Sequence, residues 1–198
     1  MIIHLEVLPT ITFAVIVVSW FAFAIVFLTR HKPPKSPDKT PDSRSVKGIV
    51  LQGLSYGIVW GAHRPYFTSL IRASKTVEAL LSVVAVILAF GSVAFTMLAV
   101  NALGKEWGLT ARVVEGHKLA THGPYSLVRH PIYTGMLGML LATGLATSYW
   151  PALVIALVIF FIGTIIRMRI EERLLHEAFG SEFDDYARRV AAIVPGIY

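Results

Sequence analysis

The segment 123–133 has residue types that could bind an anion at the start of a helix. Pro131 suits the first helical position because it lacks an N–H, and it favours an extended conformation for His130. The free N–H groups of the next turn, with the positive end of the helix dipole, would attract a carboxylate. Arg129, His130 and Tyr133 would add hydrogen-bond donors. A membrane-interface cap, with Arg and Tyr at the headgroups, explains the same residues equally well.

Arg167 and Glu171 form a second candidate constellation. They are four residues apart, so they share one face of a helix and could form an ion pair or contact opposite charges on two ligands. Arg169 and Arg173 repeat this spacing. A positively charged helix end at the membrane surface, with exposed ion pairs that contribute little to stability, explains the pattern too. Taken alone, the pattern favours this second interpretation.

Composition excludes several other kinds of site. The chain has no cysteine, which excludes disulfides, thiolate nucleophiles, Cys-ligated zinc and iron–sulfur clusters. His117, His122, His130 and His176 have no His-Glu-x-x-His or similar carboxylate spacing, so no metal is expected. The sequence has neither a Walker loop nor a Gly-x-Gly-x-x-Gly motif after a strand. The formal charge of +6 does not indicate nucleic acid, because the basic residues lie at the ends of apolar runs.

Hydropathy predicts an all-α polytopic membrane protein with about five transmembrane helices. The 198 residues are 55% hydrophobic and only 15% charged, which exceeds what a soluble core needs. About 20 residues are required to cross the ~30 Å hydrocarbon core. The apolar runs predict spans at 5–28, 46–62, 77–100, 132–147 and 150–166. The last two form a helical hairpin, and we expect its second arm to continue beyond the membrane.

The distribution of Lys and Arg predicts that the N-terminus lies outside and the C-terminus in the cytosol. Of 18 basic residues, all but Arg64, Arg72 and Lys75 follow the first span, follow the third span or lie in the C-terminal tail. The connector 29–45 has the composition of a solvated cytoplasmic loop. The first run lacks the basic n-region of a signal peptide and is expected to remain as a span.

The chain divides into two parts by polarity. Residues 1–100 hold three transmembrane helices and the connector, whereas 101–198 hold most of the polar residues that could carry chemistry, on the cytoplasmic face. In the tail, Phe179, Phe183, Tyr186 and Val190 recur at helical spacing. This pattern predicts an amphipathic helix packed on the membrane face or on the cytoplasmic loop.

Several separated motifs in the second part occur in an order typical of one family. They are Leu103-Gly104-Lys105-Glu106-Trp107, Glu115-Gly116-His117-Lys118-Leu119, Gly-Pro-Tyr-x-x-Val-Arg-His-Pro-x-Tyr-x-Gly at 123–135, Arg-x-x-x-Glu-Glu-x-x-Leu at 167–175, Phe-Gly-x-Glu-Phe-x-x-Tyr at 179–186 and a terminal Pro195. In this order they resemble the isoprenylcysteine carboxyl methyltransferase family over 101–198. The first three spans match that family only in hydrophobicity.

The resemblance implies a methyltransferase core at 101–198, made of a cytoplasmic cofactor-binding loop, the hairpin 132–166 and the C-terminal helical tail. It implies S-adenosylmethionine as the cofactor, with Arg167 facing the substrate and both Arg167 and Glu171 as catalytic residues. The implied cofactor contacts are His117, Lys118, Leu119, Ala120, Tyr125, His130, Pro131, Ile132, Tyr133 and Glu171. Ala120 replaces a more usual valine and Phe183 a common tyrosine, and neither change removes a charge that the chemistry needs.

The expected function is methyl transfer to the carboxylate of a membrane-embedded lipidated acceptor such as a prenylcysteine. A sulfonium donor is already activated and an ionised carboxylate needs no general base, so positioning should supply most of the catalysis. Arg167 would orient the acceptor, Glu171 would hold a polar part of the cofactor, and the start of the fourth span would receive its carboxylate. The expected partner is a lipophilic acceptor from the bilayer, with no nucleic acid and no metal.

Three alternatives remain open from the sequence. Phospholipid or other small-lipid N-methyltransferases share the Arg-His-Pro-x-Tyr and Glu-Glu elements. NADPH-dependent sterol-type reductases have a similar C-terminal region, including an ending like Pro195-Gly196-Ile197-Tyr198, but five spans are too few for them. A non-enzymatic membrane scaffold would give no reason for Arg167, Glu171 and the His-Pro turn to meet on one face. The sequence does not predict the oligomeric state.

Overall fold

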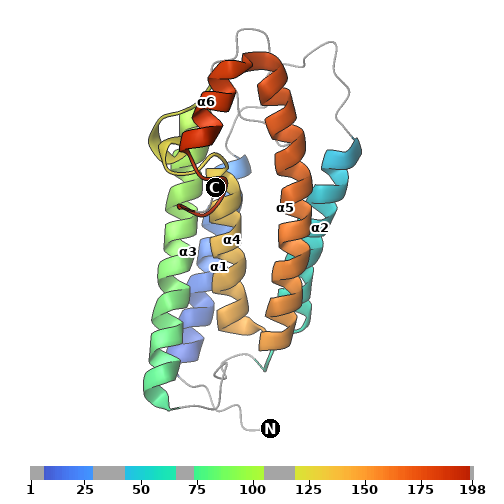
Figure 1. Ribbon diagram of the computed structural model, residues 1–198. Coiled ribbons are helices and arrows are strands. Elements are labelled where there is room, and N and C mark those ends of the chain that lie inside the picture. The colour runs from blue at the N-terminus through green and yellow to red at the C-terminus, as the bar shows by residue number, and fades with distance from the viewer. Residues whose placement is uncertain (1–6, 29–42, 66–73, 105–118, 197–198) are drawn as a thin grey trace.

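The computed structural model describes residues 7–28, 43–65, 74–104 and 119–196, and its regular elements are helices (Figure 1). In chain order these are α1 (Val7–Leu28), α2 (Ser43–Gly61), α3 (Lys75–Leu103), the short 3-10 helix η2 (Gly123–Ser126), α4 (Pro131–Thr147), α5 (Trp150–Phe179) and α6 (Ser181–Arg189). Within these ranges the β-type pairings are two isolated bridges, and no strand is present. The predicted all-α class is confirmed.

Each of the five predicted spans corresponds to one helix. Three of them, α1, α3 and α5, are long and apolar enough to cross a membrane, which makes the chain an integral membrane protein. The apolar helix α4 has only 17 residues, or about 25 Å at ~1.5 Å per residue, and is short for a complete span. Helix α5 continues without a break to Phe179, so its second half extends past the predicted end of the span, as expected.

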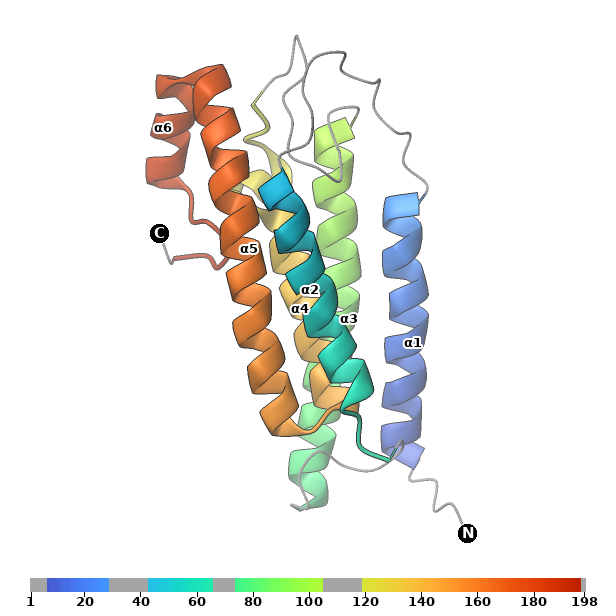
Figure 2. The ribbon, with the colours of Figure 1, turned by 90° about the vertical axis from the view of Figure 1, so that its right-hand side faces the viewer.

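Helix α4 lies at the centre of the bundle. It runs between α3 and α5 in Figure 1, and it contacts α1, α2, α3 and α5. One apolar cluster joins Leu140 of α4 to Val59 and Phe160, and a second joins Ala142 of α4 to Ile16 and Ala89. Figure 2 shows α1 and the α5–α6 pair at opposite edges of the bundle. In the first turn of α4, Ile132 packs against Val26 of α1 and Val100 of α3, which fixes the start of α4 against these two helices.

Helices α2 and α5 approach each other closely through two glycines. A Cβ atom on Gly48 would lie 2.7 Å from the carbonyl oxygen of Gly163 and 2.4 Å from Cγ of Arg167. A Cβ atom on Gly163 would lie 2.8 Å from the carbonyl oxygen of Gly48. Small residues allow this backbone approach between helices in membranes. The side-chain stem of Arg167 therefore passes directly against the backbone of α2.

The C-terminal end of α4 is held by a buried arginine. Arg64 donates from Nε to the carbonyl oxygen of Ser148 at 3.0 Å and from Nη2 to that of Leu145 at 3.0 Å. A cation is favourable at this negative end of the helix dipole. Arg64, which the sequence assigns to the outer side, thus lies at one end of α4, and the His-Pro turn lies at the other end.

Candidate functional site

The turn that begins α4 is paired with the C-terminal tail. Pro131 occupies the first helical position, as predicted, and His130 precedes it as the N-cap residue with φ −123° and ψ 61°. The predicted extended conformation of His130 is therefore wrong in ψ, which falls short of the ~120–160° usual before proline. The backbone N–H of His130 donates to Ala192 O at 3.0 Å, and that of Arg129 donates to Ala191 O at 2.8 Å. These bonds to the tail hold the turn in this conformation.

His130 lies between two adjacent carboxylates of α5. Its Nδ1 is 3.5 Å from Oε2 of Glu171, and its Nε2 is 3.1 Å from Oε1 of Glu172. Burial disfavours the charged imidazole, but the hydrogen bonds and charges of Glu171 and Glu172 outweigh this effect and raise the pKa of His130. The two consecutive glutamates of the sequence motif therefore meet on one ring.

Tyr133 and Arg167 meet on the other oxygen of Glu171. The Tyr133 hydroxyl donates to Glu171 Oε1, and Nη2 of Arg167 lies 3.6 Å from the same atom. The guanidinium carbon of Arg167 is 5.1 Å from the centroid of the Tyr133 ring, within cation–π distance. Four residues that the sequence singles out therefore lie together: His130, Tyr133, Arg167 and Glu171. The predicted contact between Arg167 and Glu171 is present.

Arg167 is buried, with 6% of its surface exposed. The interpretation of this pair as an exposed helix end, which local chemistry favours, is therefore wrong. The reason is the packing of α2 against α5, which covers the arginine. Arg167 Nη1 donates to Gln52 Oε1 at 3.1 Å, and Gln52 Nε2 donates to Thr164 Oγ1 at 2.9 Å.

Gln52 is the site neighbour that sequence reasoning missed. Its side chain comes from α2 and is buried. It stands inside the apolar run 46–62, where a polar side chain is costly unless it is paired. A glutamine within an apolar run is therefore the sequence feature that could have identified Gln52. This feature does not predict the partners of the side chain.

Arg129 does not point to the start of α4, contrary to prediction. Its Nε is 2.9 Å from Oε1 of Glu172, and its Nη1 donates to the carbonyl oxygen of Ala187 at 2.8 Å and to that of Val190. The carbonyl groups at the end of α6 attract the cation, because they form the negative end of the helix. Arg129 thus connects the turn, α5 and the tail.

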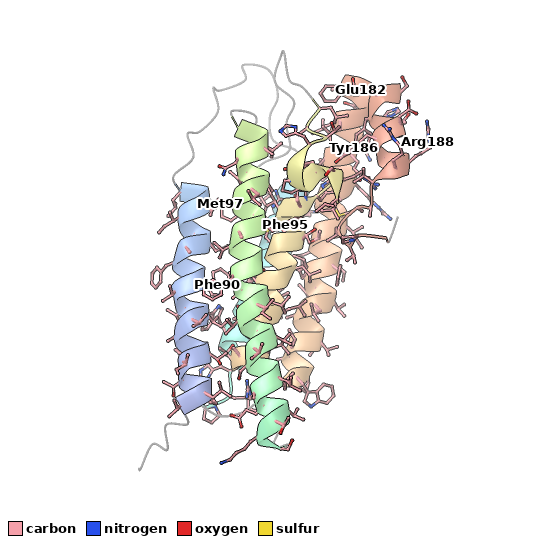
Figure 3. The ribbon with its side chains drawn as sticks, turned by 90° about the vertical axis from the view of Figure 1, so that its left-hand side faces the viewer. Phe90, Phe95, Met97, Glu182, Tyr186 and Arg188 are labelled. Carbon is pink, nitrogen blue, oxygen red and sulfur yellow. The ribbon has the colours of Figure 1, made fainter. Side chains whose placement is uncertain are left out.

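Helix α6 is the predicted amphipathic tail helix, and it packs on the turn. Phe183 and Tyr186 are buried, whereas Glu182 and Arg188 are exposed, and Figure 3 shows Tyr186 on the side of α6 that faces the turn. The Tyr186 hydroxyl donates to the carbonyl oxygen of Tyr125 at 2.6 Å. Burial raises the pKa of Tyr186 to about 12, so the phenol stays protonated and acts as a donor at neutral pH.

Most of the other predicted cofactor contacts are at least partly buried. Tyr125 and Pro131 are buried, and Leu119, Ala120 and Ile132 are half-buried. Their roles as contacts stay predictions. Two further predicted residues, His117 and Lys118, lie outside the described residues.

The site presents both signs of charge at one helix start. The carboxylate of Glu171 suits a cationic group, while the N–H groups of the first turn of α4 lie at a helix N-terminus, where anions are favoured. His130 and Arg167 add positive charge close by. This donor and acceptor set fits a ligand that carries an amino and a carboxylate group together.

The sequence matches the phospholipid methyltransferase family over residues 77–182, more than half of the chain. The matched segment includes most of α3, all of η2, α4 and α5, and the start of α6. It therefore includes the four converging residues His130, Tyr133, Arg167 and Glu171. The chain belongs to this family of membrane methyltransferases.

The individual relatives include methyltransferases and a metal-resistance protein. A probable protein-S-isoprenylcysteine O-methyltransferase of Oryza sativa subsp. japonica is 35% identical over 108 residues, which cover 50% of this chain and 53% of that protein. The nickel-cobalt-cadmium resistance protein NccN of Alcaligenes xylosoxydans xylosoxydans is 36% identical over 115 residues, 56% and 51% of the two chains. The methanethiol S-methyltransferase 2 of Bradyrhizobium diazoefficiens is 33% identical over 91 residues, 43% and 32% of the two chains.

The match to these curated relatives spans about half of their length or less. The resemblance to isoprenylcysteine methyltransferases that the motifs indicate is confirmed at the level of the family.

Proposed function

We propose that this protein transfers a methyl group from S-adenosylmethionine to the carboxylate of a membrane-embedded lipidated acceptor such as a prenylcysteine. The observation that carries the proposal is the buried Arg167 guanidinium beside Glu171, next to the start of α4. The family supports methyl transfer, and the rice relative supports a carboxylate acceptor.

Glu171 and the first turn of α4 fit the polar end of S-adenosylmethionine. When bound, this cofactor supplies a sulfonium methyl group that is already activated for displacement. Glu171 would accept a hydrogen bond from the amino group, since a carboxylate has about four lone-pair positions and its contacts with His130, Tyr133 and Arg167 leave room for another donor. The N–H groups of Ile132 and Tyr133 would receive the carboxylate, because they lie at the positive end of α4.

Arg167 would orient the acceptor carboxylate. A guanidinium matches a carboxylate with two parallel hydrogen bonds, and a buried site strengthens that attraction relative to water. An acceptor that is already an anion needs no proton removed. The new C–O bond forms as the S–CH3 bond breaks, and the bonding electron pair leaves with the sulfur. The residues of the chain therefore act by binding, alignment and exclusion of water.

An amine-bearing lipid is the second candidate acceptor, and the name of the matched family favours it. An amine must lose a proton before it can attack, and the neighbouring positive charge of Arg167 would repel its protonated form. The buried guanidinium therefore supports a carboxylate over an amine.

The product distinguishes these acceptors. The purified protein in lipid vesicles is incubated with methyl-labelled S-adenosylmethionine and a prenylcysteine acid, and the lipid extract is then treated with mild hydroxide. A carboxylate acceptor gives a methyl ester, so the label should be released as methanol. Label that hydroxide does not release as methanol would overturn the proposal in favour of N-methylation.

A further inference from the structure

We infer that Gln52 of α2 is a positioning residue that orients the Arg167 guanidinium toward the acceptor carboxylate. This inference rests on the proposed function, because it depends on Arg167 contacting the acceptor. Gln52 lies outside the residues 77–182 that match the family, so it adds to the site a component from the N-terminal half of the chain.

The orientation of the Gln52 amide is fixed by two partners on α5. Its Nε2 donates to Thr164 Oγ1 at 2.9 Å, so its Oε1 is the atom that faces Arg167 Nη1 at 3.1 Å. All three side chains are buried, with Gln52 2% and Thr164 0% exposed. A buried hydrogen-bond chain of this kind holds its members in one arrangement, because leaving any of them without a partner is costly.

The backbone of α2 fixes the arginine stem in the same place. Gly48 leaves room for Cγ and Cδ of Arg167. The close approach of Gly48 and Gly163 keeps α2 against α5, so α2 stays in contact with the arginine stem. Gln52 is one helical turn after Gly48, so a single face of α2 contacts both the stem and the head of the arginine.

Contacts from three different helices orient the guanidinium. Nη1 bonds to Gln52 on α2, Nη2 lies beside Glu171 on α5, and the ring of Tyr133 on α4 lies within 5.1 Å of its carbon. The amide oxygen of Gln52 attracts the guanidinium from α2, and Glu171 attracts it from α5. Gln52 therefore opposes the movement of Arg167 into a closer ion pair with Glu171.

Gln52 can do this without cancelling the charge of the arginine. An amide oxygen accepts a hydrogen bond but carries no net charge, so Arg167 keeps its positive charge for an acidic acceptor. A glutamate at the same position would accept the same bond and neutralise that charge. The structure therefore points to a neutral acceptor as the property required at position 52.

The test compares three near-isosteric variants with the unmodified full-length protein. Gln52→Glu keeps the bond to Arg167 and adds a negative charge, whereas Gln52→Met removes both hydrogen bonds. Thr143→Val is the matched control, because it removes a different hydrogen bond between two helices, the one that Trp20 Nε1 of α1 donates to Oγ1 of the buried Thr143 of α4. The measurements are S-adenosylmethionine affinity, the thermal unfolding midpoint in detergent, and kcat and KM for a prenylcysteine acid.

We expect both Gln52 variants to raise KM for the acid by about tenfold or more, while S-adenosylmethionine affinity stays within about threefold of the wild type. Thr143→Val should lower the unfolding midpoint, as Gln52→Met does, but leave KM nearly unchanged. Equal effects of Gln52→Met and Thr143→Val on KM would show a purely structural role and overturn the inference. An unchanged KM in Gln52→Glu would also overturn the inference. This variant still tests the inference if Gln52→Met does not fold.

Failure of the proposed function gives a different result. If the wild-type protein forms no ester from the acid, the carboxylate assignment itself is wrong. If the wild type forms ester and the Gln52 variants match it, only the positioning role of Gln52 is wrong.

Discussion

Nη2 of Arg167 lies 3.6 Å from Oε1 of Glu171, one turn further along α5. The two residues have opposite charges and, in our proposal, opposite ligands: the acceptor carboxylate for Arg167 and the polar end of the methyl donor for Glu171. Their proximity would bring the two substrates to the same short segment of one helix. Removing the charge of Glu171 should therefore weaken binding of the methyl donor, whereas changing Arg167 should impair methyl transfer to the acceptor.

Replacing Glu171 with Gln keeps the shape of the side chain and removes its charge. Hydrogen bonds to charged groups contribute roughly 1.5–3 kcal/mol, so we expect about ten- to a hundredfold weaker S-adenosylmethionine binding by calorimetry. Glu182→Gln is the control, because Glu182 is exposed on α6. Unchanged S-adenosylmethionine affinity in Glu171→Gln, together with binding of NADPH, would instead support a reductase.

Arg167→Lys keeps the positive charge and removes the planar pair of donors. A lysine cannot grip a carboxylate bidentately, so methyl transfer to a prenylcysteine acid should fall by at least about tenfold, with S-adenosylmethionine affinity nearly intact. Arg173→Lys, at an exposed position of α5, should leave both properties unchanged. A parallel loss of donor binding in Arg167→Lys would show that Arg167 serves the donor side of the site.

The raised pKa of His130 predicts a specific pH dependence of stability. The folded state favours the charged imidazole, so its contribution is fully present below the unfolded pKa of about 6.5 and is lost as pH rises through the higher folded pKa. His130→Gln should therefore lower the unfolding midpoint most below the unfolded pKa of about 6.5, and the difference from the wild type should shrink as pH rises through the folded pKa. His122→Gln, at an exposed position, serves as the control. A difference that does not vary with pH would contradict the charged state of His130.

The absence of cysteine allows the topology to be tested with single-cysteine variants. Thr121 and Ser74 are both exposed, and the distribution of basic residues assigns them to the cytosolic and outer sides. An impermeant maleimide should label Ser74→Cys in intact cells, and should label Thr121→Cys only after the membrane is permeabilised. Labelling of Thr121→Cys in intact cells would place the His-Pro turn outside and reverse the predicted orientation.

Local sequence patterns were sufficient for the helices and for much of the site. Hydropathy predicts a helix in each of the five positions where one occurs, and Pro131 identifies the first residue of α4. The four-residue spacing of Arg167 and Glu171 predicts their contact, because residues at this spacing are neighbours on any helix.

Contacts between distant segments were not predictable in the same way. Gln52 and Arg167 are 115 positions apart, and their hydrogen bond depends on how Gly48 and Gly163 let two helices approach. Arg129 has the residue type of an anion-binding group, but its direction is decided by Glu172 and by the carbonyl groups at the end of α6. Side-chain type indicates what a residue can bind, and only tertiary packing selects its partner.

The central claim is that the acceptor is a carboxylate, and a direct competition tests it. The wild-type protein is placed in vesicles that contain a prenylcysteine acid and phosphatidylethanolamine together, with methyl-labelled S-adenosylmethionine outside. The measured quantity is the ratio of base-labile ester to base-stable methylamine in the extracted lipids. We predict that nearly all of the label is in the ester and that Arg167→Lys reduces this ester selectively. Label found mainly in methylated phosphatidylethanolamine would contradict the account and assign the protein to lipid N-methylation.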